Sequence, residues 1–213
     1  MAAESSGRHT AGELAAAGRQ AWETVSQWLG RRGDSIDVTL LFTELCGFPA
    51  WVLEAGDERA LELLREVATV VEPCITAHQG KLVKRLGYGH MAVFPEPAEA
   101  LQAALDMQNA LVGAGIQPAG PRRRRTPQPR LRAGLHKGRP QRLEGDYLGA
   151  DVNIAARISE AARPGEVLIS GEVLASLAEE RRASLKIKRR RAFRAKGAPP
   201  GLGVYCVSAP EQG

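Results

Sequence analysis

The sequence contains few cysteines and no long apolar run. Its three cysteines, Cys46, Cys74 and Cys206, are odd in number and lack CxxC spacing, which argues against a zinc cluster and a disulfide framework. We therefore predict reduced, mostly buried thiols. No segment approaches the about 18 to 20 consecutive apolar residues of a membrane-spanning helix, and the N-terminus lacks the basic-then-apolar pattern of a signal peptide. These absences predict a cytoplasmic protein with no membrane span.

Aromatic residues are also scarce, at 5% of the chain, whereas the rest of the composition is ordinary. Hydrophobic residues make up 44% and charged residues 25% of the 213 residues, as in typical globular proteins. The composition therefore excludes collagen-like, coiled-coil and wholly disordered chains. The length suits one domain of ordinary size.

Charge is unevenly distributed along the chain. The formal net charge is +5, but residues 107–143 and 181–210 each hold nine basic residues and no acidic one. Such stretches attract polyanions, whether nucleic acid, an anionic membrane surface or a triphosphate. Phe193 and Tyr205 are the only aromatic residues in the two stretches, so stacking on bases is not indicated. Nucleic acid is therefore the least favoured partner.

Helical and strand-like patterns alternate along the chain. Predicted helices cover residues 11–30, 57–78, 97–112, 151–162 and 171–180. Predicted strands cover residues 36–42, 81–85, 90–94, 131–135 and 166–170, with a closing pair of strands within 185–207. Residues 87–89, Gly-Tyr-Gly, have the chemistry of a hairpin turn. This order predicts an α/β or α+β sandwich in which helices pack against one mixed sheet.

The sequence RRGDS interrupts the pattern after the first helix and suggests a boundary near residue 34. We predict a helix and linker over residues 1–34, one domain over 35–208 and a tail over 209–213. Within the domain, residues 113–130 are rich in Gly, Pro and Arg, which indicates a solvated basic insertion. Its arginines could contact phosphate, lipid or solvent alone.

Three sequence blocks resemble the catalytic domain of class III adenylyl and guanylyl cyclases. They are LFTELCGF (41–48), GKLVKRLGYGHMAVF (80–94) and LRAGLHKG followed by GDYLGADVNIAARI, which together span 131–158. Their order and spacing match the family, and the resemblance extends over residues 36–208. It implies a ferredoxin-like α/β sandwich that works as a head-to-tail dimer, with active sites at the interface.

The resemblance also implies a reaction. In this family the ribose 3′-hydroxyl of ATP attacks the α-phosphorus, pyrophosphate leaves, and 3′,5′-cyclic AMP forms for intracellular signalling. Positioning and charge stabilisation carry such a reaction. Two divalent ions, Mg²⁺ or Mn²⁺, are held by two aspartates in the family, in the manner of two-metal phosphoryl chemistry.

The two metal positions of the family are altered here. Glu44 stands at the first aspartate position and is one methylene longer, so it is a candidate ligand, although a surface glutamate would look the same. Tyr88 stands at the second, and a phenol with a pKa near 10 is a poor magnesium ligand. We therefore expect weak or no adenylate cyclase activity from the chain alone.

The nucleotide positions of the family are retained. Lys84 and Asp146 match a lysine and an aspartate that read the adenine edge, which favours ATP over GTP. Asn153 matches a residue that orients the ribose, and Arg157 one that places positive charge at the α-phosphate. Plainer alternatives remain open: Lys84 as an exposed strand lysine, Asn153 as a helix cap, and Arg157 as a surface ion-pair partner.

Two further basic residues are phosphate candidates. Lys196, in the sequence AKG, matches a lysine that reaches the terminal phosphates, and Arg132 is a weaker candidate. Three assemblies are consistent with this mixed site: a homodimer with two incomplete sites, a heterodimer with an aspartate-bearing cyclase chain, and a catalytically dead homologue that binds nucleotide or regulates a partner. His78, His90 and His136 are expected to be structural.

Overall fold

The computed structural model describes residues 35–116, 129–191, 193 and 201–209. The predicted helix over 11–30, most of the basic insertion and Lys196 lie outside these residues. Within the described part of the chain, no helix combines the length and the apolar character that crossing a bilayer requires.

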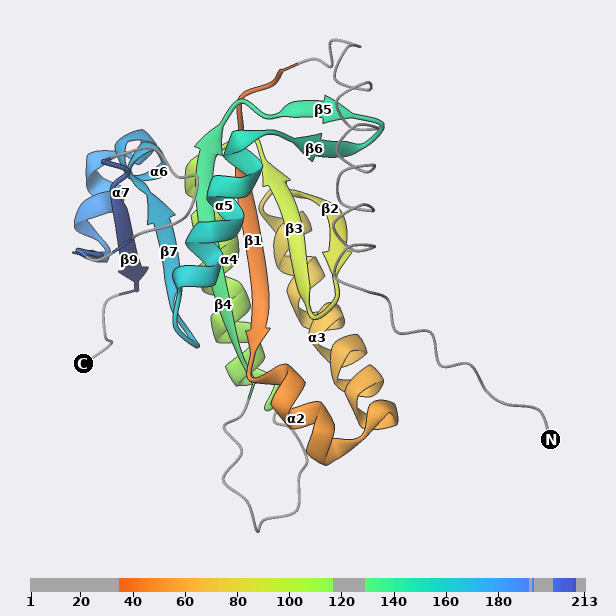
Figure 1. Cartoon of the computed structure of the whole chain (residues 1–213). Coiled ribbons are helices and arrows are strands. Elements are labelled where there is room, and N and C mark those ends of the chain that lie inside the picture. Colours follow the sequence, from red (N-terminus) through yellow and green to blue (C-terminus); the bar gives the residue numbers. More distant parts are fainter. Residues whose placement is uncertain (1–34, 117–128, 192, 194–200, 210–213) are drawn as a thin grey trace, which may run out of the picture. The chain divides into compact units, whose positions relative to one another are not determined.

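A seven-stranded sheet forms the centre of the described domain, in the order β2-β3-β1-β4-β7-β9-β8 (Figure 1). All neighbouring strands are antiparallel except β4 and β7, so the sheet is mixed, as predicted. The strands are β1 (Val38–Cys46), β2 (Lys81–Leu86), β3 (Gly89–Phe94), β4 (Arg130–Gly138), β7 (Val167–Ser170), β8 (Lys186–Arg189) and β9 (Val204–Ser208).

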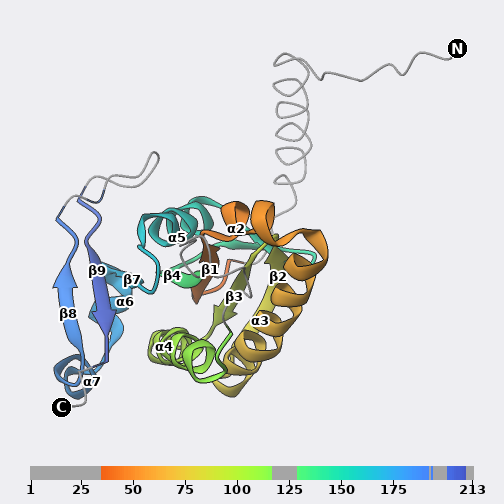
Figure 2. The same ribbon diagram turned by 90° about the horizontal axis from the view of Figure 1, so that it is seen from below.

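Helices cover both faces of the sheet. Figure 2 shows α3 (Asp57–Ala77) and α4 (Pro97–Gly113) on one face and α5 (Ala150–Ala161) on the other. The α3 helix forms because apolar residues recur every three or four positions, and Leu63, Val67, Val71 and Ile75 are buried from this stripe. On the α5 face, Ile154, Ala155 and Ile158 are buried against the sheet. The predicted sandwich is therefore confirmed.

Two elements were not predicted from the sequence. The helix α2 (Phe48–Ala55) begins after Gly47, whose φ of +83° favours glycine, and it carries a proline in its first turn. A separate hairpin consists of β5 (Gln141–Leu143) and β6 (Asp146–Leu148). Both elements are too short to show a clear apolar period.

The structure corrects several predicted boundaries. The strand predicted over 36–42 runs over Val38–Cys46, and the one predicted over 131–135 extends over Arg130–Gly138. The helix predicted over 171–180 is broken into α6 (Gly171–Ser176) and α7 (Glu179–Ala183). The break lies at Leu177, which is extended and 2% exposed, so burial of its side chain accompanies the interruption of the helix.

The cysteines are free, as predicted, but they are only partly buried. The expectation of mostly buried thiols is therefore wrong in degree. Burial nevertheless has the largest effect on the pKa of each thiol, and it raises all three pKa values above the ordinary value.

Candidate nucleotide site

Glu44 lies near the end of β1, between two neighbouring strands. Its backbone is in register with Gly89 on β3 and with Arg132 on β4. Gly89 is required for this close packing, because a Cβ there would lie 2.1 Å from the Thr43 carbonyl oxygen. The side chain of Glu44 is 29% exposed and accepts a hydrogen bond from Arg132, with Nη2 and Oε2 2.5 Å apart.

Arg132 is held at two points. Besides its bond to Glu44, it donates from Nη1 to the carbonyl oxygen of Glu160, near the end of α5, at 2.9 Å. The carboxylate of Glu160 in turn accepts from Arg157, with Nη1 and Oε2 2.5 Å apart. A continuous set of contacts thus joins Glu44, Arg132, Glu160 and Arg157, from β1 and β4 to the last turn of α5.

Tyr88 lies in the turn between β2 and β3 and packs against apolar residues. Its ring stacks on Phe48 of α2, with ring centroids 5.3 Å apart and an interplanar angle of 29°. Phe48 also contacts Trp51, which is 2% exposed. The Tyr88 carbonyl oxygen accepts from the Leu45 N–H at 3.1 Å. Tyr88 therefore helps to fix α2 beneath the end of β1.

These residues do not fit a pair of divalent ions. Glu44 is the one carboxylate at the two positions that resemble metal ligands, and Arg132 already pairs with it. Tyr88 contributes its ring to packing. Among the described residues, no group of three or more His, Cys, Asp or Glu side chains is arranged to hold a metal ion. Magnesium needs a near-octahedral shell of hard oxygen ligands, and this shell is not provided.

Lys84 and Asp146 lie in contact although 62 positions separate them in the sequence. Lys84 Nζ donates to Asp146 Oδ2 at 2.5 Å, and this contact joins β2 to β6. Both side chains are 39% exposed. The other carboxylate oxygen accepts from the Tyr147 N–H at 2.7 Å, which fixes the carboxylate. The pair presents one donor and one acceptor in one accessible place.

Asn153 and Arg157 lie four residues apart on α5, both on its exposed face. The alternative that Asn153 caps the helix is wrong, because Gly149 occupies the N-cap position. The ion-pair alternative for Arg157 is present as its contact with Glu160, but both side chains are about half exposed. Such a surface pair stabilises the fold by about 0 to 1 kcal/mol.

The sequence reasoning missed a contact that anchors the start of α5. His136 on β4 lies with Nε2 3.2 Å from Asp151 Oδ1, and the Arg139 N–H donates to the other oxygen of Asp151 at 2.7 Å. A Cβ on Gly138 would lie 2.3 Å from the Asp151 carboxylate carbon, so glycine provides the necessary space. In the sequence, Gly138 was the residue that could have indicated a close approach of another side chain at this position.

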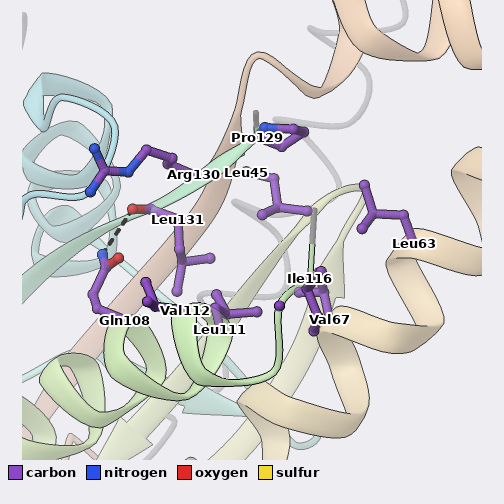
Figure 3. Close-up of a pocket in the computed structure, with 11 residues that line it drawn as sticks. Leu45, Leu63, Val67, Gln108, Leu111, Val112, Ile116, Pro129, Arg130 and Leu131 are labelled. Carbon is purple, nitrogen blue, oxygen red and sulfur yellow. Dashed lines mark hydrogen bonds between the residues drawn. The ribbon is translucent and has the colours of Figure 1, made fainter. Parts of the chain in front are cut away.

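An apolar pocket of about 150 Å³ lies on the other face of the sheet, between α3, α4, β1 and β4 (Figure 3). Leu45 and Leu131 line it, and these residues follow Glu44 and precede Arg132 in their strands, so their side chains point to the opposite face. Gln108 donates to the Leu131 carbonyl oxygen at its edge, at 2.8 Å. This pocket is separate from the predicted nucleotide residues.

The chain belongs to the adenylate and guanylate cyclase catalytic domain family, whose sequence profile matches residues 32–208. An uncharacterized protein of Mycobacterium tuberculosis is 30% identical over 145 residues, which cover 68% of this chain and 35% of that protein. A pH-sensitive adenylate cyclase of the same organism is 30% identical over 142 residues, which cover 67% of this chain and 33% of that enzyme. The chain thus spans about a third of the length of these curated relatives.

Solved cyclase structures share the fold. The adenylyl cyclase CyaB from P. aeruginosa superposes with a TM-score of 0.68 at 19% identity, over 83% of this chain and 95% of that one. The adenylate/guanylate cyclase/hydrolase from Silicibacter pomeroyi gives a TM-score of 0.68 at 22% identity, over 84% and 99%. The expected cyclase fold is therefore confirmed.

Proposed function

We propose that this cyclase domain binds ATP and that, alone, it is a weak or inactive adenylate cyclase. The observation that carries the proposal is the contact between Lys84 and Asp146. Two segments far apart in the sequence bring an ammonium donor and a carboxylate acceptor together, half exposed, where the family resemblance expects the adenine edge to bind.

This donor and acceptor favour adenine over guanine. Adenine offers a ring nitrogen that accepts from Lys84 and an amino group that donates to Asp146. Guanine presents a carbonyl oxygen in place of that amino group, which would face a carboxylate that can only accept. A buried or half-buried polar mismatch of this kind weakens binding strongly.

Asn153 and Arg157 would act on the sugar and the phosphate. Asn153 orients the ribose so that the 3′-hydroxyl faces the α-phosphorus, and Arg157 stabilises the charge that develops as the new bond forms and pyrophosphate leaves. Their exposure on one face of α5 supports this role. Lys196 is proposed to contact the terminal phosphates.

We expect these groups to act across a head-to-tail dimer. The β5–β6 hairpin, which holds Asp146, lies toward the opposite end of the sheet from the β2–β3 turn, which holds Tyr88 (Figure 1). Residues from the two ends would meet when a second chain packs in the reverse direction. The partner is a second copy of this chain or a related cyclase chain.

We expect low activity because the two positions that resemble metal ligands are altered. The divalent ions that the family uses would find one carboxylate, Glu44, already paired with Arg132, and a tyrosine ring packed on Phe48. The same contrast favours a second function, in which this chain supplies the nucleotide residues to a partner that carries both aspartates.

Cyclic AMP formation tests the proposal. The purified chain is incubated with ATP and either Mg²⁺ or Mn²⁺, alone and mixed with an aspartate-bearing cyclase chain. We expect at most slow formation by the chain alone, abolished by Arg157→Ala. Formation that rises sharply on mixing would support the half-site function. Rapid formation by the chain alone would contradict the expected weakness.

A further inference from the structure

The ion pair of Glu44 and Arg132 stands where the family resemblance expects a metal ligand. The two residues are cross-strand neighbours in the register of β1 and β4, and their charged groups are 2.5 Å apart. Arg132 is only 19% exposed and has a second anchor on the Glu160 carbonyl oxygen. The protein itself therefore supplies a positive charge beside Glu44, in the guanidinium of Arg132.

We propose that Arg132 takes the place of a divalent ion as the positive charge beside the triphosphate, so that this domain binds ATP without metal. The inference rests on the proposed ATP site and extends it. Glu44 is then the counter-ion that positions Arg132, and it is not a metal ligand.

Competition between Arg132 and a divalent ion favours Arg132. Binding of an ion to Glu44 would remove the acidic partner of a guanidinium that is four-fifths buried, and an unpaired buried charge is strongly unfavourable. The ion would gain a single protein carboxylate, because Tyr88 packs on Phe48. Magnesium gives up its water ligands reluctantly and is poorly held by one such group.

Arg132 also has donors to offer a phosphate. Nη2 donates one N–H to Glu44 and Nη1 donates one N–H to the Glu160 carbonyl oxygen, so each terminal nitrogen keeps a second N–H for a phosphate oxygen. Nε is buried and does not take part. A guanidinium carries five N–H donors in a planar fork that matches phosphate oxygens. Arg157 contacts the same residue, Glu160, so a second guanidinium lies close along α5.

The two roles of Glu44 predict opposite effects of removing its charge. If Glu44 holds a metal ion, Glu44→Gln loses the binding that depends on the ion. If Glu44 balances Arg132, the same change removes a negative charge close to the triphosphate and leaves the positive charge of Arg132 without its counter-ion. Binding of a polyanion then becomes tighter.

A fluorescent ATP analogue titrated into the full chain, in EDTA or in excess Mg²⁺, tests the proposal. We expect the dissociation constants in the two conditions to agree within about threefold. Glu44→Gln should tighten binding in EDTA by about fivefold, and Arg132→Gln should weaken it by about tenfold. Glu62→Gln is the matched control, because it removes the same charge from an exposed Arg59 ion pair on α3. It should change binding by less than about twofold.

Three results would overturn the proposal. Wild-type binding that requires Mg²⁺, or binding in excess Mg²⁺ that a folded Glu44→Gln variant loses, would identify Glu44 as a metal ligand and would leave the proposed ATP site standing. Absence of binding in both conditions would overturn the metal-free site and the proposed function together. Thermal melting of each variant checks that it is folded.

Discussion

The two ends of the candidate site differ in what their side chains are free to do. At one end, Lys84 and Asp146 contact each other while half exposed, so an incoming base could replace their direct bond. At the other end, Glu44 is paired with a largely buried arginine and Tyr88 is packed on Phe48. In the proposed function, nucleotide recognition and metal binding are therefore separable within one cyclase fold, since different strands and turns hold the two sets of residues.

Restoring the metal end should have the largest effect. The double change Glu44→Asp and Tyr88→Asp provides the two aspartates of the family and should raise cyclic AMP formation by about 100-fold or more, through charge stabilisation by bound ions. The rate is measured with Mn²⁺ and saturating ATP. Tyr88→Phe is the control, because it keeps the ring and adds no ligand. A folded, dimeric, ATP-binding double variant with no gain would show that the rest of the site is not competent.

Removing the positive charge of Arg157 on α5 should have the next largest effect. Arg157→Ala in the restored double variant should lower kcat by about 100-fold, since it removes a donor aimed at charge developing at the α-phosphate. Arg59→Ala, which removes an arginine from an ion pair on α3, serves as the control and should leave kcat unchanged. Equal losses from both changes would contradict a specific role for Arg157.

Tyr88 should contribute to stability where the family uses an aspartate for chemistry. Tyr88→Ala removes the stacked contact with Phe48 and should lower the free energy of unfolding by about 2 kcal/mol. Tyr88→Phe keeps the ring and should cost less than about 0.5 kcal/mol. Urea unfolding of the three proteins measures the difference. An unchanged midpoint for Tyr88→Ala would mean that the ring does not hold α2.

His78, at the end of α3, should make a smaller, pH-dependent contribution to stability through its contacts with α4. Its Nδ1 and Nε2 each lie 2.8 Å from a carboxylate, those of Glu99 and Asp106 on α4. Burial lowers the pKa of His78, but the hydrogen bonds and charges of the two carboxylates outweigh burial and raise it above 6.5. A raised pKa means that this stabilisation is fully present below about pH 6.5 and is lost as the pH rises through the folded-state pKa.

The measurement for His78 is a comparison of wild type and His78→Gln by urea unfolding between about pH 6 and pH 8.5. At the low end, wild type should be more stable by about 1 kcal/mol, and the difference should shrink as the pH rises. His90, whose pKa is lowered chiefly by burial, is present in both proteins, so its contribution to the pH dependence cancels in the difference. A difference that grows with pH would contradict the double contact of a protonated imidazole.

The sequence predicted the elements that show a strong period. The helix expected over residues 57–78 is Asp57–Ala77, because its apolar positions repeat over many turns. Three-residue strands such as those of the β5–β6 hairpin carry no such signal. Tertiary packing also divides the helix expected over 171–180 at the buried Leu177.

The candidate site could be predicted in part. The resemblance assigned Lys84 and Asp146 to one function, and the structure brings them into contact across 62 positions. The pairing of Glu44 with Arg132 could not be predicted, because it depends on the register of β1 against β4, which residue types alone do not determine. Their direct ion pair is what changes the expected chemistry of the metal end.

Nucleotide selectivity tests the central claim most directly. Isothermal titration of the full chain with ATP and with GTP should show ATP binding more tightly, by about tenfold or more, because Asp146 accepts from the adenine amino group. Asp146→Asn, whose amide can also donate, should reduce this preference. Equal affinity for the two nucleotides, or no binding of ATP, would contradict an intact adenine-recognising end in this cyclase domain.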